Sequence, residues 1–427
     1  MRILVITPYL PWPLNSGGAT AQFSTLKCLA EDHAFVVVAP LYDPREVEFL
    51  KQVEAALPQV RFVGVPVWWQ EVPTKRNLVV RGMRWLQYRL RQRGERPVPT
   101  VNTLYYPFNP RSEAYLKAVS AELEKGVDVC QVEFAEMMPL GCWLPAAIPR
   151  VFIHHQIHYV YARRCIEAQG DPNGYAHYLA TVMEAQEFAY LQHFDTIVTF
   201  SREDREAIQP RLPGVNIVTS PFPVPADLSD GSAVAAAFAG HFCFVASGSH
   251  NPNRDALEWL LSEIWPQIAA QLPSATLRII GEWSPADQAL FARPGVKFLG
   301  FVPELPPVLH GGIMLVPLRV GSGLRVKILA ALTLGVPVVT TAIGAEGLLL
   351  EPGAEMLVGN SAGDFAAAAV KVASDPVLWP AMARAGREAV KRNYSPAMVR
   401  AQRNQIYQAL MAKKSAAKRV GETELVP

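Results

Sequence analysis

The stretch VGSGLRVKILAALTLGVPVVTTAIGAEGL, residues 320–348, places a small-residue loop directly in front of two cations. The loop is Gly321–Gly323, and Arg325 and Lys327 fall in the first turn of the helix expected after it. A helix N-terminus already concentrates positive partial charge, so two cations there oppose the helix dipole and need a compensating anion. Solvated side chains are the alternative, but the pattern favours a phosphate or diphosphate. The apolar run at Val336–Thr340 predicts a buried strand after that helix.

Similar apolar runs alternate with helical stretches along the chain, first over residues 3–199 and again over residues 242–358. This βα rhythm is typical of parallel sheets covered by helices on both faces. Between the two halves, SPFPVPADLSDGSA (220–233) has three prolines in five positions, which disfavour a helix and an internal strand. We therefore predict an α/β protein with two doubly wound, Rossmann-like parallel-sheet domains facing each other across a cleft. The expected strands are Ile3–Ile6, Phe35–Ala39, Arg61–Val65, Val127–Val132, Val151–Ile153, Thr196–Thr199, Phe242–Ala246, Ala275–Ile280, Lys297–Leu299, Ile313–Val316, Val336–Thr340 and Glu355–Val358.

The proline-rich break defines the domain boundaries that we expect. The first domain covers residues 1–219, the linker covers 220–233, and the second domain covers 234–390. A helical region at 391–412 is expected to pack back towards the first domain. The tail at 413–427 has few apolar residues and is expected to be disordered.

Composition excludes several classes of protein. The chain has 427 residues, half of them apolar, which is enough for two cores without disulfides. The net charge is +2 and the common nucleic-acid recognition sequences are absent, so we expect a small-molecule partner and no nucleic acid. Five scattered cysteines favour a reducing compartment. No signal segment and no run of the roughly 18 apolar residues needed to cross a membrane is present, so a cytoplasmic protein is expected.

Ligands of open parallel sheets bind beyond the carboxyl ends of the strands. Besides the loop in the opening stretch, three segments after expected strands contain residues small enough for backbone N–H groups to approach an anion. Each segment is also compatible with an ordinary tight turn, but their shared position at strand ends favours one ligand site. The three segments contain Gly17 and Gly18 in NSGGAT, Gly248 and Ser249 in SGSHNPNRDA, and Gly281 in GEW.

Together these segments resemble the retaining glycosyltransferases of family 4, the glycosyl transferases group 1. The second half is similar through GSHNPNRDALEWLLSEIWPQI, LRIIGEW, VKFLGFVPELPPVL, LVPLRVGSGLRVKILAALTLGVPVVTT and IGAEGL, in the family's order and spacing. The first half is similar through ILVITPYLPWPLNSGGA and FDTIVTFSREDREAI. The resemblance implies the GT-B architecture and transfer of a sugar from a nucleotide-diphosphate donor, with retention of anomeric configuration. It implies no metal ion and no cofactor beyond the nucleotide sugar itself, which is a substrate.

The resemblance also assigns roles to individual residues. Positions matching Arg325 and Lys327 bind the donor diphosphate and stabilise the leaving group, and the histidine near the anomeric carbon corresponds to His155. Because His154 and His158 are close by in the sequence, a structural histidine or a metal site is the alternative. Donor contacts are expected from Gly17, Gly18, Gly248, Ser249, Gly281, Val302, Gly321, Ser322, Gly323, Leu324 and Glu346.

Two carboxylates of the family pattern are missing. The glutamate that usually begins the glycine loop falls on Val320–Gly321, and the one that bonds the donor ribose is replaced by Ala330. Leaving the ribose hydroxyls without a charged partner costs about 1–3 kcal/mol. Glu346, which follows the next expected strand, is the candidate replacement.

The segment KRNLVVRGMRWLQYRLRQRGER, residues 75–96, has eight basic side chains and one acidic. Apolar residues recur on one helical face, so the segment predicts an amphipathic helix. Such a helix can lie on an anionic membrane surface, which would suit a lipid-linked acceptor. Alternatively, it packs its apolar stripe on the domain and exposes its arginines to water.

Two functional hypotheses follow. The first is an active retaining transferase that moves a sugar to a glycan or lipid-linked acceptor in cell-envelope or exopolysaccharide synthesis, located in the cytoplasm or on the inner face of the membrane. The second is a degenerate GT-B protein that binds a ligand or a partner enzyme. The missing glutamates favour the second, whereas Arg325, Lys327 and His155 favour the first.

Overall fold

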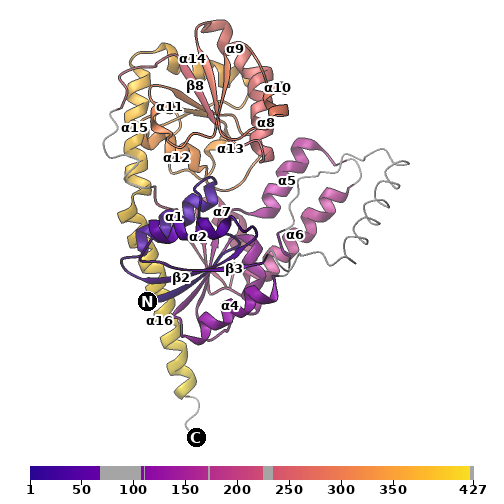
Figure 1. Cartoon of the computed structure of the whole chain (residues 1–427), viewed down its shortest axis with the longest axis vertical. Helices are drawn as coiled ribbons and strands as arrows, with labels where there is room; N and C mark the ends of the chain where they lie inside the picture. Colours follow the sequence, from indigo (N-terminus) through magenta and orange to yellow (C-terminus); the bar gives the residue numbers. More distant parts are fainter. Residues whose placement is uncertain (68–106, 110, 172–173, 225–233, 424–427) are drawn as a thin grey trace, which may run out of the picture. The chain divides into compact units, whose positions relative to one another are not determined.

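The computed structural model describes residues 1–67, 107–109, 111–171, 174–224 and 234–423 (Figure 1). The basic segment at 75–96 and residues 225–233 of the expected linker lie outside the described residues. The chain divides into two compact units, so parts of its first half belong with its second half. The first unit comprises Met1–Pro13, Ala30–Ile153 and His158–Thr196, and the second comprises Leu14–Leu29, His154–Ile157 and Ile197–Pro427.

The first sheet is parallel and has seven strands in the order β3-β2-β1-β4-β5-β6-β7. An internal strand of this sheet, β1, pairs in parallel with both β2 and β4. The side chains of Ile3–Ile6 are completely buried, as expected for a parallel strand covered on both faces. The strands are β1 (Arg2–Ile6), β2 (Ala34–Leu41), β3 (Arg61–Pro66), β4 (Val129–Glu133), β5 (Arg150–His154), β6 (Thr196–Thr199) and β7 (Asn216–Thr219).

The second sheet is also parallel and has six strands in the order β10-β9-β8-β11-β12-β13. Its strands are β8 (His241–Val245), β9 (Thr276–Ile280), β10 (Val296–Gly300), β11 (Ile313–Val316), β12 (Val338–Thr340) and β13 (Leu357–Val358).

Helices connect the strands, and several begin at the side-chain cap that their sequence supplies. Ser112 caps α4 by accepting a hydrogen bond from Tyr115 N, and Ser201 caps α7 by accepting one from Asp204 N. The helices of the first half are α1 (Gly17–Leu29), α2 (Glu46–Ala56), α4 (Glu113–Glu124), η2 (Ala135–Cys142), α5 (His158–Gln169), α6 (Tyr175–Leu191), α7 (Arg202–Ile208) and η3 (Gln209–Arg211). Those of the second half are α8 (Asn251–Trp259), η5 (Leu260–Ile264), α9 (Trp265–Gln271), α10 (Pro285–Leu290), α11 (Pro306–Leu309), α12 (Val326–Thr333), α13 (Ala342–Ala345), α14 (Ala362–Ser374), α15 (Leu378–Tyr394) and α16 (Pro396–Thr423).

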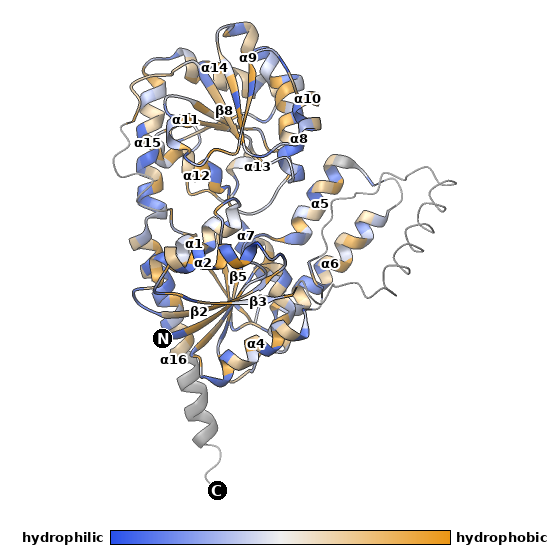
Figure 2. Cartoon of the chain, viewed as in Figure 1, coloured by the Kyte–Doolittle hydropathy of each residue, from blue (hydrophilic) through white to orange (hydrophobic). Residues whose placement is uncertain are grey.

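Both sheets are doubly wound, because the strand order reverses between β1 and β4 in the first and between β8 and β11 in the second. The predicted class of an α/β protein with two doubly wound parallel sheets is therefore confirmed. Figure 2 shows hydrophobic residues concentrated in the strands of both sheets. Every expected strand is present, and no end differs from the expected one by more than two residues. The strand that the sequence did not predict is β7, whose four residues NIVT are too few for a periodic pattern.

The described part of the linker, Ser220–Val224, forms no strand and bonds to the C-terminal helices. Arg403 Nη2 in α16 donates to Ser220 O at 3.0 Å, and Val224 N donates to Tyr394 O at 2.9 Å. Helix α16 continues to Thr423, whereas disorder was expected from residue 413. The alanine, lysine and arginine residues that make this tail poor in core-forming side chains are strong helix formers. Within the described residues, no helix is both long and apolar enough to cross a membrane.

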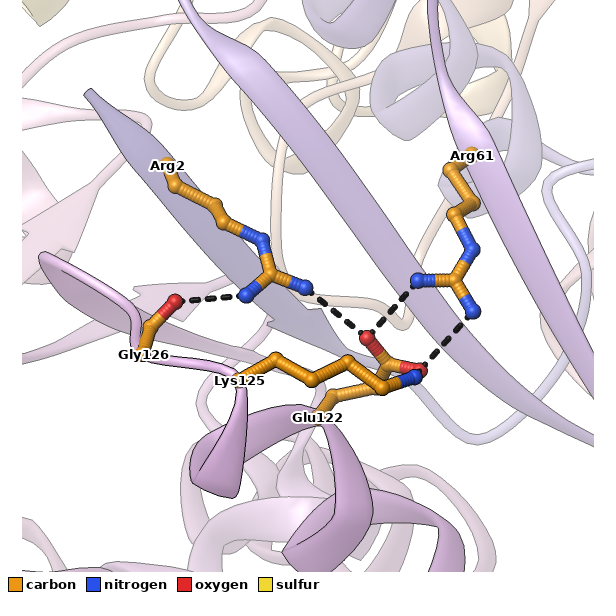
Figure 3. Close-up of polar contacts among 5 residues, drawn as sticks. All are labelled: Arg2, Arg61, Glu122, Lys125 and Gly126. Carbon is orange, nitrogen blue, oxygen red and sulfur yellow. Dashed lines mark hydrogen bonds and ion pairs between the residues drawn. The ribbon is translucent and has the colours of Figure 1, made fainter.

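A buried carboxylate ties the amino ends of β1 and β3 to the end of α4 (Figure 3). Glu122 is 2% exposed and accepts hydrogen bonds from Arg2, Arg61 and Lys125 at 2.7–3.0 Å. Arg2 Nη1 also donates to the carbonyl of Gly126 at 2.6 Å. Burial raises the pKa of the Glu122 carboxyl, but the bonds from Lys125 and Arg61 outweigh it and lower that pKa overall.

We expect Glu122→Gln to lower the free energy of unfolding by about 3 kcal/mol, because three cations are left facing one another around a neutral amide. The folded pKa of Glu122 is lowered, so its stabilisation is present above the ordinary pKa of a glutamate and is lost as the pH falls through the lowered value. Denaturant unfolding between pH 3 and pH 7 measures both effects. Glu113→Gln, which breaks an exposed pair with Lys117 on the same helix, is the control and should change little. Equal losses in the two variants would contradict the prediction.

Candidate functional site

The glycine loop and helix α12 form the centre of the candidate site in the second unit. Helix α12 begins at Val326, so Lys327 lies in its first turn, as the sequence predicts. Arg325, which was also expected in the first turn, is the N-cap residue just before it. Arg325 is 8% exposed and donates from Nη1 to Ser322 O at 2.7 Å and to Gly323 O. Its Nη2 donates to Ile343 O in α13 at 3.2 Å. The guanidinium therefore joins the glycine loop to the helix that follows β12, and its charge has a fixed position.

Lys327 lies against neutral groups. Its Nζ donates to Asn253 Oδ1 of α8 at 3.0 Å and lies 5.6 Å from the ring centroid of Phe244, at the end of β8. Burial, and then the charge of Arg325, lower the pKa of Lys327 to about 7. An anion that approaches such a lysine stabilises its protonated, charged form. Arg325 and Lys327 thus provide a pair of cations suited to a diphosphate.

His155 lies beside the glycine loop, although the two are far apart in the sequence. A Cβ atom added at Gly323 would lie 2.6 Å from His155 O, and Gly323 has φ +79°, so this position requires glycine on both counts. The His155 imidazole packs edge-on against Phe200, with 4.9 Å between ring centroids. The turn after β5 is therefore in contact with the loop that precedes α12. His154 is 1% exposed, whereas His155 is half-buried, so of these two neighbours His155 is the more accessible.

Two carboxylates, Asp204 and Glu346, lie near Arg325. Glu346 directly follows α13, and a Cβ atom at the next residue, Gly347, would lie 2.6 Å from Ser201 Cβ. The turn that contains Glu346 therefore packs against the start of α7, which carries Asp204. Burial raises the pKa of the Asp204 carboxyl; among the charged groups around it, His154 and Arg325 lower this pKa and Glu346 raises it. Glu346 is thus brought into the same group of charges as Arg325.

The other predicted donor contacts lie in three places. Gly17 begins α1, and its Cβ position is 3.1 Å from the side chain of Val326 in α12, so the NSGGAT segment reaches the same helix start, with Gly18 next to it. Ser249 Oγ bonds to Ser247 Oγ at 2.8 Å on the exposed loop before α8. Leu324 and Val302 are both half-buried, in the glycine loop and after β10 respectively.

Gly248 and Gly281 have packing reasons to be glycine that involve no ligand. A Cβ atom at Gly248 would lie 2.7 Å from the ring of Trp283, and one at Gly281 would lie 2.2 Å from Ala246 O. Trp283 is buried and donates from Nε1 to Ala246 O at 2.9 Å. This packing shapes the loop after β8.

Sequence reasoning did not identify Asn253, Phe200 and Asp204, which support the site residues. Asn253 stands in the quoted SGSHNPNRDA segment, but only the folded chain shows that it bonds Lys327. Asp204 had one detectable signal, because Ser201 and Asp204 have the S-x-x-D spacing of a helix start. Within the described residues, no group of three histidine, cysteine, aspartate or glutamate side chains is placed to hold a metal ion.

Comparisons with known proteins show what the chain is similar to. Residues 241–375 match the family model described as Glycosyl transferases group 1. No protein with a curated description matches the chain. Among solved structures, sucrose-phosphate synthase from Thermosynechococcus elongatus is similar with a TM-score of 0.67 at 15% identity, covering 97% of this chain and 100% of that one. HepE of Anabaena, in complex with UDP and glucose, has a TM-score of 0.64 at 13% identity, with 96% and 100% covered. TarM of S. aureus, in complex with Fondaparinux, alpha-GlcNAc-glycerol and UDP, has a TM-score of 0.66 at 12% identity, with 95% and 100% covered.

These findings show the GT-B glycosyltransferase fold over nearly the whole chain. The group 1 glycosyltransferase match covers β8 to α14, which includes the glycine loop, Arg325, Lys327 and Glu346. The resemblance read from the sequence motifs is therefore confirmed. The roles of the individual residues belong to the proposal below.

The contact between Gly323 and His155 gives a test that needs no ligand. We expect Gly323→Ala to lower the melting temperature more than Gly353→Ala, because both glycines have positive φ but only Gly323 has backbone within van der Waals distance of its Cβ position. The cost of the conformation alone is about 1–2 kcal/mol and is common to both variants. Differential scanning calorimetry measures the difference. Identical melting temperatures would show that His155 O does not pack on Gly323.

Proposed function

We propose that the protein is a retaining glycosyltransferase that moves a sugar from a nucleotide-diphosphate sugar to a glycan or lipid-linked acceptor without a metal ion. The observation that supports this most directly is the cation pair, in which Arg325 is held by three backbone carbonyls and Lys327 has neutral partners. When the bond between the sugar and the diphosphate breaks, negative charge develops on the departing oxygen. Fixed cations at that point stabilise the transition state more than the bound substrate.

The other residues fit around this cation pair. We assign the anomeric carbon to the neighbourhood of His155, which lies against the same glycine loop. Backbone groups of Gly321–Gly323 and of the α1 start at Gly17 would contact the phosphates or the sugar. The solved structures of HepE with UDP-glucose and of a pneumococcal O-GlcNAc transferase with UDP and GlcNAc support a uridine diphosphate sugar as the first donor to test.

The wider role is proposed from the resemblance alone. We place the reaction in cell-envelope or exopolysaccharide synthesis, in the cytoplasm, with peripheral contact to the inner face of the membrane through residues 75–96. Binding of the purified protein to vesicles containing anionic lipid, with and without residues 75–96, tests the membrane contact.

A second candidate is a degenerate GT-B protein that binds a ligand or a partner enzyme. The observation that favours it is the loss of both family carboxylates, at Val320–Gly321 and at Ala330. Calorimetric titration with UDP, GDP and a panel of their sugars, followed by assays of sugar transfer and donor hydrolysis, separates the two. Binding with turnover supports the transferase, binding without turnover supports the degenerate protein, and an absence of binding removes the donor-site proposal.

We expect Lys327→Met to weaken UDP binding by about 10–100-fold and uridine binding much less, because the lost charge-assisted bond is to phosphate. The pKa of Lys327 is about 7, so at pH 8 much of the free protein lacks this proton and takes it up when UDP binds. UDP affinity should therefore fall as the pH rises above 7. Calorimetry in buffers of different ionisation enthalpy measures the proton uptake.

Lys371→Met, at an exposed position on α14, is the matched control and should leave both affinities unchanged. Equal weakening of UDP and uridine by Lys327→Met, or unchanged proton uptake, would place Lys327 outside the diphosphate site.

We expect Glu346→Gln to weaken binding of a UDP-sugar, because Glu346 is the proposed acceptor for the ribose hydroxyls and charged hydrogen bonds are stronger than neutral ones. Ala330→Glu should restore affinity in that variant by rebuilding the usual family contact. Calorimetry measures both, with Glu351→Gln, an exposed carboxylate nearby, as the control. An active enzyme that is indifferent to Glu346→Gln would show that backbone or water holds the ribose.

If the wild-type protein binds no donor and Ala330→Glu creates binding, the second candidate, a degenerate GT-B protein, is correct.

A further inference from the structure

Helix α5, which follows the turn containing His155, begins directly after an apolar residue. The residue before it, Ile157, is apolar and 1% exposed, so its side chain offers no acceptor to the first backbone N–H groups of the helix. These groups need partners when a helix end is buried. Glu187, about one turn before the C-terminal end of α6, accepts hydrogen bonds from the first two of these N–H groups. Its Oε1 accepts from His158 N at 3.3 Å and its Oε2 from Tyr159 N at 3.2 Å.

Glu187 is completely buried, at 0% exposure. Burying a carboxylate is costly unless it is well bonded, and the two N–H groups at a helix N-terminus offset that cost through both hydrogen bonds and the helix dipole. Neighbouring contacts fix the same pair of helices. The ring of Phe188 lies 5.6 Å from that of Tyr159. Glu184, one turn before Glu187, forms an ion pair with Arg163 further along α5 and does not bond the N–H groups at the helix start. Helices α5 and α6 therefore meet in one register.

The turn that carries His155 is short and is fixed at both ends. It consists of His155–Ile157, which follow the last residue of β5 and precede the first residue of α5. Strand β5 is held by its pairing with β4, and the start of α5 is held by Glu187. Between these two points the carbonyl of His155 packs on Gly323 and its ring packs on Phe200.

We propose that Glu187 is a positioning residue for His155: by accepting hydrogen bonds from the first two N–H groups of α5, it fixes the turn that presents the His155 imidazole to the glycine loop. This inference rests on the proposed function, in which His155 lies next to the transferred sugar. Glu187 touches neither donor nor acceptor. Its effect on the reaction is carried through three residues of chain.

The test compares Glu187→Gln with Glu184→Gln, the same substitution one turn away on the same helix. A glutamine at 187 can accept from one N–H group but presents its own NH₂ to the other, so the turn loses its fixed position. We expect kcat with a UDP-sugar to fall by about tenfold or more, since small misplacements of catalytic groups cost up to a hundredfold. The Kd for UDP should change by less than about twofold, because the diphosphate contacts belong to α12 and its loop.

A merely structural role for Glu187 predicts a different result. In that case Glu187→Gln lowers the melting temperature, but kcat measured well below that temperature is unchanged, and this outcome would overturn the proposal. Glu187→Asp keeps the charge and one of the two bonds, so its kcat should lie between those of the wild type and Glu187→Gln. If Glu187→Gln does not fold, Glu187→Asp is compared with Glu184→Gln instead. A lower kcat in Glu187→Asp supports the positioning role, and equal kcat values overturn it.

A measurement without substrate separates failure of this proposal from failure of the proposed function. The imidazole ¹⁵N signals of His155, assigned with His155→Gln, report its position directly. They should shift or broaden in Glu187→Gln and stay in place in Glu184→Gln. Unchanged His155 signals in Glu187→Gln would overturn the positioning role, whether or not the protein transfers a sugar.

Discussion

The guanidinium of Arg325 is the contact on which the geometry of the candidate site depends. It donates to carbonyl oxygens on both sides of the site, those of Ser322 and Gly323 in the loop before α12 and that of Ile343 in α13. These carbonyls offset part of the cost of burying a cation without neutralising its charge. The guanidinium therefore holds the loop before α12 and the helix α13 together.

The second cation is held in a different way and has a different consequence. Lys327 rests on an amide oxygen and an aromatic ring, and its pKa is lowered to about 7 by burial and by Arg325. Arginine keeps its proton in nearly any environment, whereas lysine loses it when poorly solvated. The pair thus combines a permanent charge with one whose protonation depends on its surroundings.

The Glu122 cluster and the candidate site residues lie at opposite edges of the first sheet. The Glu122 cluster joins Arg2 and Arg61 at the amino ends of β1 and β3. The His155 turn follows the carboxyl end of β5, and α7 with Asp204 follows the carboxyl end of β6. In parallel sheets the carboxyl edge is the ligand side. A buried carboxylate with several cationic partners can therefore stabilise the amino edge without changing the charge of the candidate site.

The local pattern of the sequence was sufficient for the fold class and for the cation pair. Parallel strands buried on both faces are continuous apolar runs, so they are visible one by one, and Gly321–Gly323 followed by Arg325 and Lys327 is a local motif. A four-residue strand such as β7 has no such signal. The sequence does contain a signal for the continuation of α16 to Thr423, which is the high helix propensity of the tail, but the prediction of disorder rested on the lack of apolar residues alone. The contacts between distant segments were decided by the tertiary structure. Three contacts show this: Gly323 packs on His155 O, Asn253 bonds Lys327, and Glu187 caps α5. The residues in each contact are 29 to 168 positions apart in the sequence. Such contacts form only where the folded sheets bring the loops after different strands close together. A local sequence pattern does not contain that information, because it covers only residues that are near one another in the chain.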